Sequence, residues 1–176
     1  MALFRSPVHI GGVKFRPIKQ GLAEIAATVE IPAGFVLTTA DTLRFFQVGA
    51  NVAIRDLVLK TDELDTGTNT LTLNVGFLSH NTGVTASNAT AYAAAATVGQ
   101  AGGVVRYEPT IAAPAANYTV QVVPAANANA NAAAGGAKRL TMVATLEAAR
   151  APTGILTDFG SGNGGAYDHG RADPSV

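Results

Sequence analysis

The chain has 176 residues, a length that suits one domain with a single hydrophobic core and terminal extensions. Its 12 basic and 12 acidic side chains cancel, so net charge predicts binding neither to nucleic acid nor to an anionic membrane. The absence of cysteine excludes disulfides, cysteine nucleophiles and thiolate metal sites, and it suits synthesis in a reducing cytoplasm.

Charged residues are few and unevenly placed. They make up 14% of the chain, and residues 66–137 contain only Arg106 and Glu108. A surface of Ala, Thr, Asn, Gly and Val is weakly hydrated, which suits burial against neighbouring subunits. A core with neutral loops would give the same composition. No segment resembles a secretion signal or reaches the length of a membrane-spanning helix, so we expect a soluble protein that is not secreted.

Residues 1–22 hold four basic side chains and no acidic one, interrupted by Pro and Gly. We predict a basic N-terminal arm that lies along a groove on a partner as an extended strand. An edge strand of the same domain, with solvated basic side chains, fits the pattern equally well. The residues predicted to contact the partner are the basic and aromatic ones, namely Phe4, Arg5, Lys14, Phe15, Arg16 and Lys19.

Residues 23–149 show the pattern of a β-sandwich domain, because apolar residues recur with the short period of strands between turn residues. The first strands are expected over 23–31, 35–37, 42–48 and 52–60, and imperfect alternation in the last of these indicates a bulge. Residues 62–69 are predicted to be a hairpin turn into a strand over 71–77. In that strand one face is apolar, with Leu71, Leu73, Val75 and Phe77.

Residues 87–98 have the features of one short helix. Ser87 stands at a capping position, alanines follow, and Gly99 lies beyond the end. Tyr92 and Ala96 are at helical spacing, so this helix would cover one end of a sheet.

The closing strands are expected where branched and aromatic residues concentrate, over 104–107, 118–123 and 140–146. The Ala, Asn and Gly-rich segment 124–136 has too few bulky residues to form core, and we predict a loop there. Residues 150–176 are a glycine-rich C-terminal tail, in which Phe159 and Tyr167 are candidates to anchor the tail on a neighbouring subunit. A disordered terminus is the alternative.

The residues that could carry chemistry do not converge. His9, His80 and His169 have no metal-ligand spacing. Asp62, Glu63, Asp65 and Asn69 cluster at the predicted turn, but their spacing is not that of a calcium loop and a solvated turn explains them. No nucleophile elbow or phosphate-binding loop is present. We therefore predict no enzyme, with no catalytic residue, cofactor or bound metal.

Three segments in this order carry a resemblance to a known family: 52–59, then 64–67 leading into 71–76, then 91–100. The chain resembles small virion structural proteins of tailed bacteriophages over residues 30–149. The resemblance implies an all-β, jelly-roll-like sandwich in the virion and no catalytic residues.

The preferred hypothesis is a capsid decoration, or cement, protein made in the host cytoplasm and placed on the exterior of the capsid. It would self-associate, as a homotrimer, and bind the phage major capsid protein at lattice junctions, with the basic arm facing acidic capsid surface and Phe4 and Phe15 as apolar anchors. The alternative is a phage tail or fibre component that binds a host surface.

Overall fold

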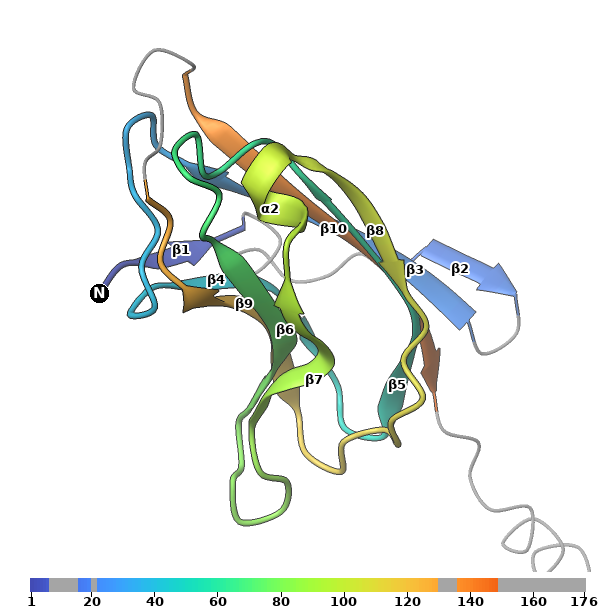
Figure 1. Ribbon diagram of the computed structural model, residues 1–176. Helices are drawn as coiled ribbons and strands as arrows, with labels where there is room; N and C mark the ends of the chain where they lie inside the picture. Colours follow the sequence, from blue (N-terminus) through green and yellow to red (C-terminus); the bar gives the residue numbers. More distant parts are fainter. Residues whose placement is uncertain (7–15, 20–21, 130–135, 149–176) are drawn as a thin grey trace, which may run out of the picture.

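Two five-stranded sheets face each other in the computed structural model, which describes residues 1–6, 16–19, 22–129 and 136–148, with only the backbone of 16–19 (Figure 1). We call them sheet 1 and sheet 2. In spatial order, sheet 1 contains β1 (Leu3–Arg5), β4 (Thr42–Val48), β9 (Tyr118–Ala126), β6 (Thr72–Ser79) and β7 (Asn88–Ala96). Sheet 2 contains β2 (Arg16–Lys19), β3 (Leu22–Ile31), β10 (Lys138–Ala148), β5 (Val52–Thr61) and β8 (Gly103–Tyr107). The expected all-β sandwich is confirmed.

The chain crosses between the sheets at almost every connection from β3 to β10. Only β6 and β7, which follow one another directly, lie in the same sheet. The resulting orders β4-β9-β6-β7 and β3-β10-β5-β8 are those of a jelly roll, and apart from the parallel pair β1 and β4 the paired strands are antiparallel. A four-residue helix, α2 (Val98–Ala101), joins the edges of the two sheets.

The core lies between the sheets and is built mainly from alternate residues of β3, β4, β5, β6, β9 and β10. Tyr118, Val120 and Val122 of β9 are fully buried, and so are Leu71, Leu73 and Val75. Burial of side chains of this size stabilises the fold by about 1.5–3 kcal/mol each. The Tyr118 hydroxyl donates to the carbonyl of Val52 at 2.8 Å, which ties sheet 1 to β5 of sheet 2. The predicted apolar faces of these strands are confirmed.

The predicted hairpin at 62–69 is wrong, because β5 and β6 belong to opposite sheets and this segment crosses between them. The prediction of a solvated turn also fails for Asp65, which is fully buried. Its carboxylate accepts hydrogen bonds from the backbone N–H groups of Thr70 (2.7 Å), Leu71 (2.9 Å) and Asn129 (3.0 Å). Asp65 therefore holds the crossover against the segment that follows β9.

The helix predicted at 87–98 is wrong as well, since residues 88–96 form β7 and the helix is the short α2 behind it. Alanine favours a helix by only a few tenths of a kcal/mol per residue over most residues, and pairing with β6 outweighs that preference. The ring of Tyr92 lies 6.2 Å from that of Phe77 of β6. The strand is irregular, because Asn88 and Ala93 are separated by four residues along β7 but pair with residues of β6 that are only two positions apart.

The remaining differences are small. β9 continues to Ala126, past the predicted start of the loop, and Phe35–Leu37 is not a strand. The bulge expected in 52–60 is confirmed, because Asp56 pairs with Thr145 and Ile54 with Leu146, which leaves Arg55 without an opposite residue. In the part of the chain that the structure describes, no helix has both the length and the apolar character needed to cross a membrane.

Candidate interaction surfaces

Charge is divided unequally between the two sheets. The five strands of sheet 1 contain two charged residues, Arg5 and Arg44, and no acidic one. The acidic residues that lie in strands are all in sheet 2: Glu24, Glu30, Asp56 and Glu147. Sheet 1 therefore presents an almost neutral surface with two positive charges.

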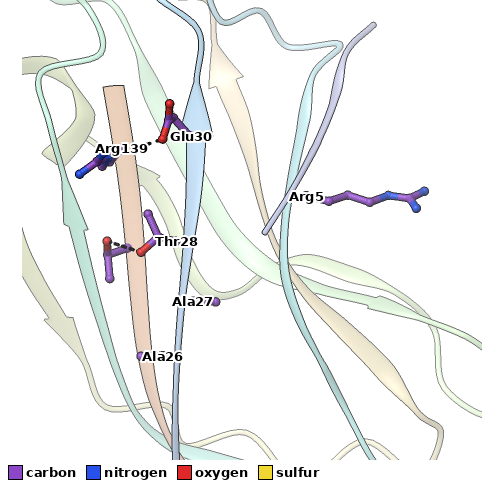
Figure 2. Close-up of a pocket in the computed structure, with 7 residues that line it drawn as sticks. Arg5, Ala26, Ala27, Thr28, Glu30 and Arg139 are labelled. Atoms are coloured by element: carbon purple, nitrogen blue, oxygen red, sulfur yellow. Dashed lines mark hydrogen bonds and ion pairs between the residues drawn. The ribbon is translucent and has the colours of Figure 1, made fainter. Parts of the chain in front are cut away.

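The two arginines of sheet 1 are neighbours. In the parallel pair of β1 and β4, Arg5 lies beside Arg44. Arg44 is opposite Gln121 of β9, whose chain neighbours Val120 and Val122 face the core. Arg44 and Arg5 consequently extend from the outer face of sheet 1. Figure 2 shows the Arg5 side chain extending away from β3.

Neither arginine has a counter-ion among the described residues, where the ion pairs are Arg55 with Glu147, Arg106 with Asp56, and Arg139 with Glu30. The Arg44 Nε is buried and has no hydrogen-bond partner in the described structure. An unsatisfied buried donor is uncommon in folded proteins and calls for an explanation.

The strand that carries Arg5 is held firmly on the domain. The backbone N–H of Ala2 donates to the Asp41 carboxylate at 2.6 Å, and Ser6 N donates to the carbonyl of Arg44 at 3.0 Å. Phe4 faces the other way from Arg5, and its ring packs edge-on against Phe35 with the centroids 4.9 Å apart. Arg5 is thus presented from a fixed edge strand.

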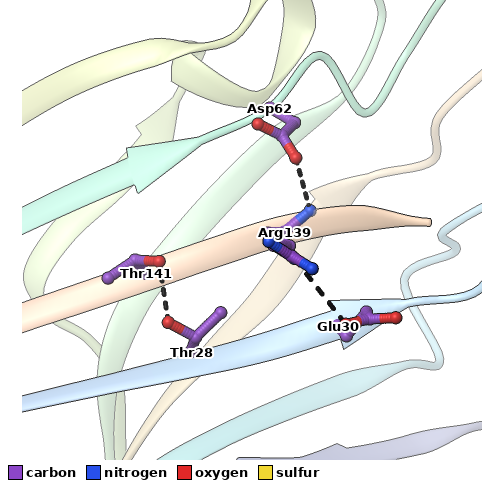
Figure 3. A network of polar contacts seen from close by, with 5 residues as sticks. All are labelled: Thr28, Glu30, Asp62, Arg139 and Thr141. Atoms are coloured by element: carbon purple, nitrogen blue, oxygen red, sulfur yellow. Dashed lines mark hydrogen bonds and ion pairs between the residues drawn. The ribbon is translucent and has the colours of Figure 1, made fainter. Parts of the chain in front are cut away.

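On the outer face of sheet 2 several polar side chains are paired with one another. The hydroxyls of Thr28 and Thr141 lie 2.8 Å apart. Figure 3 shows this contact and places Arg139 between Glu30 and Asp62. The Arg139 side chain lies 3.7 Å from the Glu30 carboxylate, and its backbone N–H donates to Asp62 at 2.8 Å. Exposed ion pairs of this kind contribute about 0–1 kcal/mol, so they balance charge on this face more than they stabilise it.

Among the hollows of the described surface, two are lined by residues of the strands. The larger, of about 700 Å³, is lined by Arg5 and by β3 and β10, and there Thr28 pairs with Thr141 and Glu30 with Arg139 (Figure 2). The second, of about 420 Å³, runs between the edge strands β7 and β8 and is lined mainly by Ala93–Ala96, Val104 and Val105. Its Tyr107 hydroxyl has no hydrogen-bond partner in the described structure, and burial raises the pKa of Tyr107.

The histidines and acidic residues do not form a metal site in the part that the structure describes, where no three of them come together. His80 contacts the Thr119 hydroxyl at 2.7 Å through Nε2. His9 and His169 lie outside the described residues.

The structure describes only some of the residues that the sequence predicts to contact a partner. Phe4 and Arg5 lie in β1 at the edge of sheet 1, whereas Arg16 and Lys19 lie in β2 at the edge of sheet 2. The strands β1 and β2 thus place these residues in the domain's own sheets, and whether they contact a partner stays a prediction. The other four predicted contact residues lie outside the described part of the chain: Lys14, Phe15, Phe159 and Tyr167.

Sequence reasoning missed Arg44. Two signals in the sequence could have found it: Arg44 is the single charged residue of the expected strand 42–48, and it has the parity opposite to the apolar Leu43 and Phe45.

No protein-family model and no curated protein matches this sequence. Solved structures do match. A chain in the capsid of Ralstonia phage GP4 is 24% identical, with a TM-score of 0.63 over 85% of this chain and 100% of that one. The two chains share one fold. A chain in the capsid asymmetric unit of cyanophage Pam1 is 23% identical, with a TM-score of 0.56 over 78% of this chain and 94% of that one.

Proposed function

We propose that this protein is a structural subunit of a bacteriophage virion that binds the capsid lattice as a decoration, or cement, protein. The observation that carries the proposal is the shared fold, which extends over 100% of a chain in the Ralstonia phage GP4 capsid and 94% of a chain in the cyanophage Pam1 capsid. The likeness therefore covers all of the first chain and nearly all of the second, and not one motif within a larger protein.

The surface chemistry supports a role in binding and not in catalysis. In the hollow lined by β3 and β10, Thr28 is paired with Thr141 and Glu30 with Arg139, and the described residues contain no cluster of acidic residues and histidines. A sheet face with almost no charge is suited to close contact with another protein, because the centres of protein interfaces are depleted in charged residues.

The mechanism in this proposal is stabilisation by mass action. A protein that binds the assembled shell but not the free subunits shifts the equilibrium toward the shell, by about 2.7 kcal/mol per site when its concentration is 100 times the dissociation constant. The protein would attach as a homotrimer on the capsid exterior, at junctions of the lattice formed by the major capsid protein. Several simultaneous contacts would then slow the release of each copy.

The test is to locate and remove the protein in purified virions. We expect it to co-purify with heads, to be released by mild denaturant, and to leave heads that open at a lower temperature. Adding back the purified protein should restore the original temperature, whereas adding heat-denatured protein should not. Recovery of the protein with isolated tails would support a tail or fibre component instead, and its absence from virions would contradict any virion role.

A further inference from the structure

We propose that Arg5 and Arg44 form a carboxylate-binding pair, and that the outer face of sheet 1 is the surface through which this protein binds an acidic region of a different capsid protein. The inference rests on the proposed function, because it names the face and the partner chemistry for the same lattice contact. It follows from the division of charge between the sheets, from the register of β1 and β4, and from the lack of a counter-ion.

The first argument is the geometry of the pair. Arg5 and Arg44 occupy directly adjacent positions on paired strands, which lie about 4.8 Å apart. Like charges at adjacent cross-strand positions destabilise a sheet unless another group compensates them. A carboxylate placed between the two guanidinium groups would remove this repulsion and accept charge-assisted hydrogen bonds from both.

The second argument is the state of Arg44. Its Nε is buried without a hydrogen-bond partner in the described structure, so no described acceptor fixes the orientation of the guanidinium group. The nearest cross-strand neighbour on the other side is Gln121, which is uncharged. An external acceptor could therefore set the position of this side chain without first displacing an internal ion pair.

The surroundings of the pair match a protein partner better than a nucleic acid. Outward positions of the central strands β6 and β9 carry no charge: Thr72, Asn74, Leu78 and Val123 are half-buried, and Thr119 is buried. Proteins that bind nucleic acid through its phosphates commonly neutralise about 6–10 of them, and two arginines on a chain of net charge +0 fall well short of that.

A second copy of this chain is a weaker candidate for the partner. Three of the four acidic residues in strands already form ion pairs within the chain: Glu30, Asp56 and Glu147. A contact between copies would have to break those pairs or rely on Glu24, the one strand carboxylate without an ion pair in the described structure, and on loop carboxylates. The acidic region is therefore assigned to another protein of the lattice.

The experiment measures binding to phage shells that lack this protein, by co-sedimentation at several salt concentrations. The variants are Arg5→Gln, Arg44→Gln and the double variant Arg5→Glu/Arg44→Glu. Each single variant should weaken binding about tenfold, which corresponds to about 1.4 kcal/mol, because each removes one charged hydrogen-bond donor from the contact. The double reversal should abolish binding. The matched control is Lys60→Gln, which removes an exposed cation from sheet 2 and should bind like the wild type.

The outcomes separate the two proposals. If the wild-type protein does not bind the shells, the proposed function fails. If it binds and the arginine variants bind equally well, the inference alone is overturned. The inference also fails if added DNA displaces the protein, or if the arginine variants alter self-association in sedimentation without altering shell binding. Arg5 is exposed, so Arg5→Gln keeps the test valid even if Arg44→Gln impairs folding, which a thermal melt would reveal.

Discussion

Asp41 shows how one buried carboxylate holds the N-terminal strand. It is 2% exposed, and one oxygen accepts from the backbone N–H of Ala2 while the other accepts from the N–H and the hydroxyl of Thr38, both at 2.9 Å. Desolvation by burial raises the pKa of Asp41, but the hydrogen bonds from Ala2 and Thr38 outweigh it and hold the pKa below the ordinary value of 3.8. The ionised form is therefore the one that stabilises the fold.

Replacing Asp41 by Asn should lower the free energy of unfolding by about 1–3 kcal/mol at pH 7, because a charged acceptor of several donors is lost. A carboxylate whose pKa is lower in the folded than in the unfolded protein stabilises the fold at pH values above its unfolded pKa. That contribution disappears as the pH falls through its folded pKa. The deficit of the variant should consequently shrink below pH 3.8.

Urea unfolding at a series of pH values measures this dependence. Glu63→Gln is the matched control, because Glu63 is exposed and the change is the same in kind. A deficit that stays constant down to pH about 2 would show that the charge of Asp41 is not the cause.

At the scale of elements, the pairing of β6 with β7 is the least regular part of sheet 1. Two register shifts interrupt it, and Ala95 has a φ of 50°, in the left-handed region that alanine seldom adopts. Gly76 makes the close approach of the strands possible. A Cβ atom at this position would lie 2.1 Å from the carbonyl oxygen of Asn88 and 2.4 Å from the carbonyl carbon of Ala89.

Gly76→Ala should therefore destabilise the protein by about 1–3 kcal/mol or more, since backbone atoms of β7 must move to admit the methyl group. Gly49→Ala is the control, because the nearest atom to a Cβ there is 4.0 Å away, and it should change stability by less than about 0.5 kcal/mol. Chemical denaturation of both variants makes the comparison. Equal stabilities for the two variants would mean that β7 does not lie over Gly76 in solution.

At the scale of the whole molecule, neighbours in a sheet are rarely neighbours in the sequence. β10 pairs with β3, more than 100 residues earlier, and β9 pairs with β4 and β6. Each such pairing closes a long loop before its contacts form, which slows folding. Both sheets bury their inner faces in one shared core, so neither is expected to be stable alone.

We therefore predict that the protein unfolds in one cooperative transition and refolds in milliseconds to seconds. The chain has 4 tyrosines and no tryptophan, so stopped-flow tyrosine fluorescence is the measurement, with the buried Tyr118 as its main structural reporter. Far-ultraviolet circular dichroism should give the same midpoint of unfolding. Two separate transitions, or folding within microseconds, would contradict a single interleaved core.

The strands with clear alternation were predictable because their pattern depends on neighbouring residues alone. Tyr118, Val120 and Val122 face the core as their period of two requires, and the bulge at Arg55 follows from the break in the pattern. The candidate surface was predictable only in part. Arg5 was identified from its basic surroundings, but Arg44 matters because β1 lies beside it, and that pairing joins segments about 40 residues apart.

The amino-acid sequence was enough to predict the all-β class, the inward face of most strands and the low charge. Tertiary structure decided which sheet each strand joins, the strand conformation of Asn88–Ala96, and the burial of Asp65. The physical reason is that strand pairing and the satisfaction of a buried carboxylate both depend on partners distant in the chain. Alanine-rich and polar segments carry no strong local preference that could anticipate those partners.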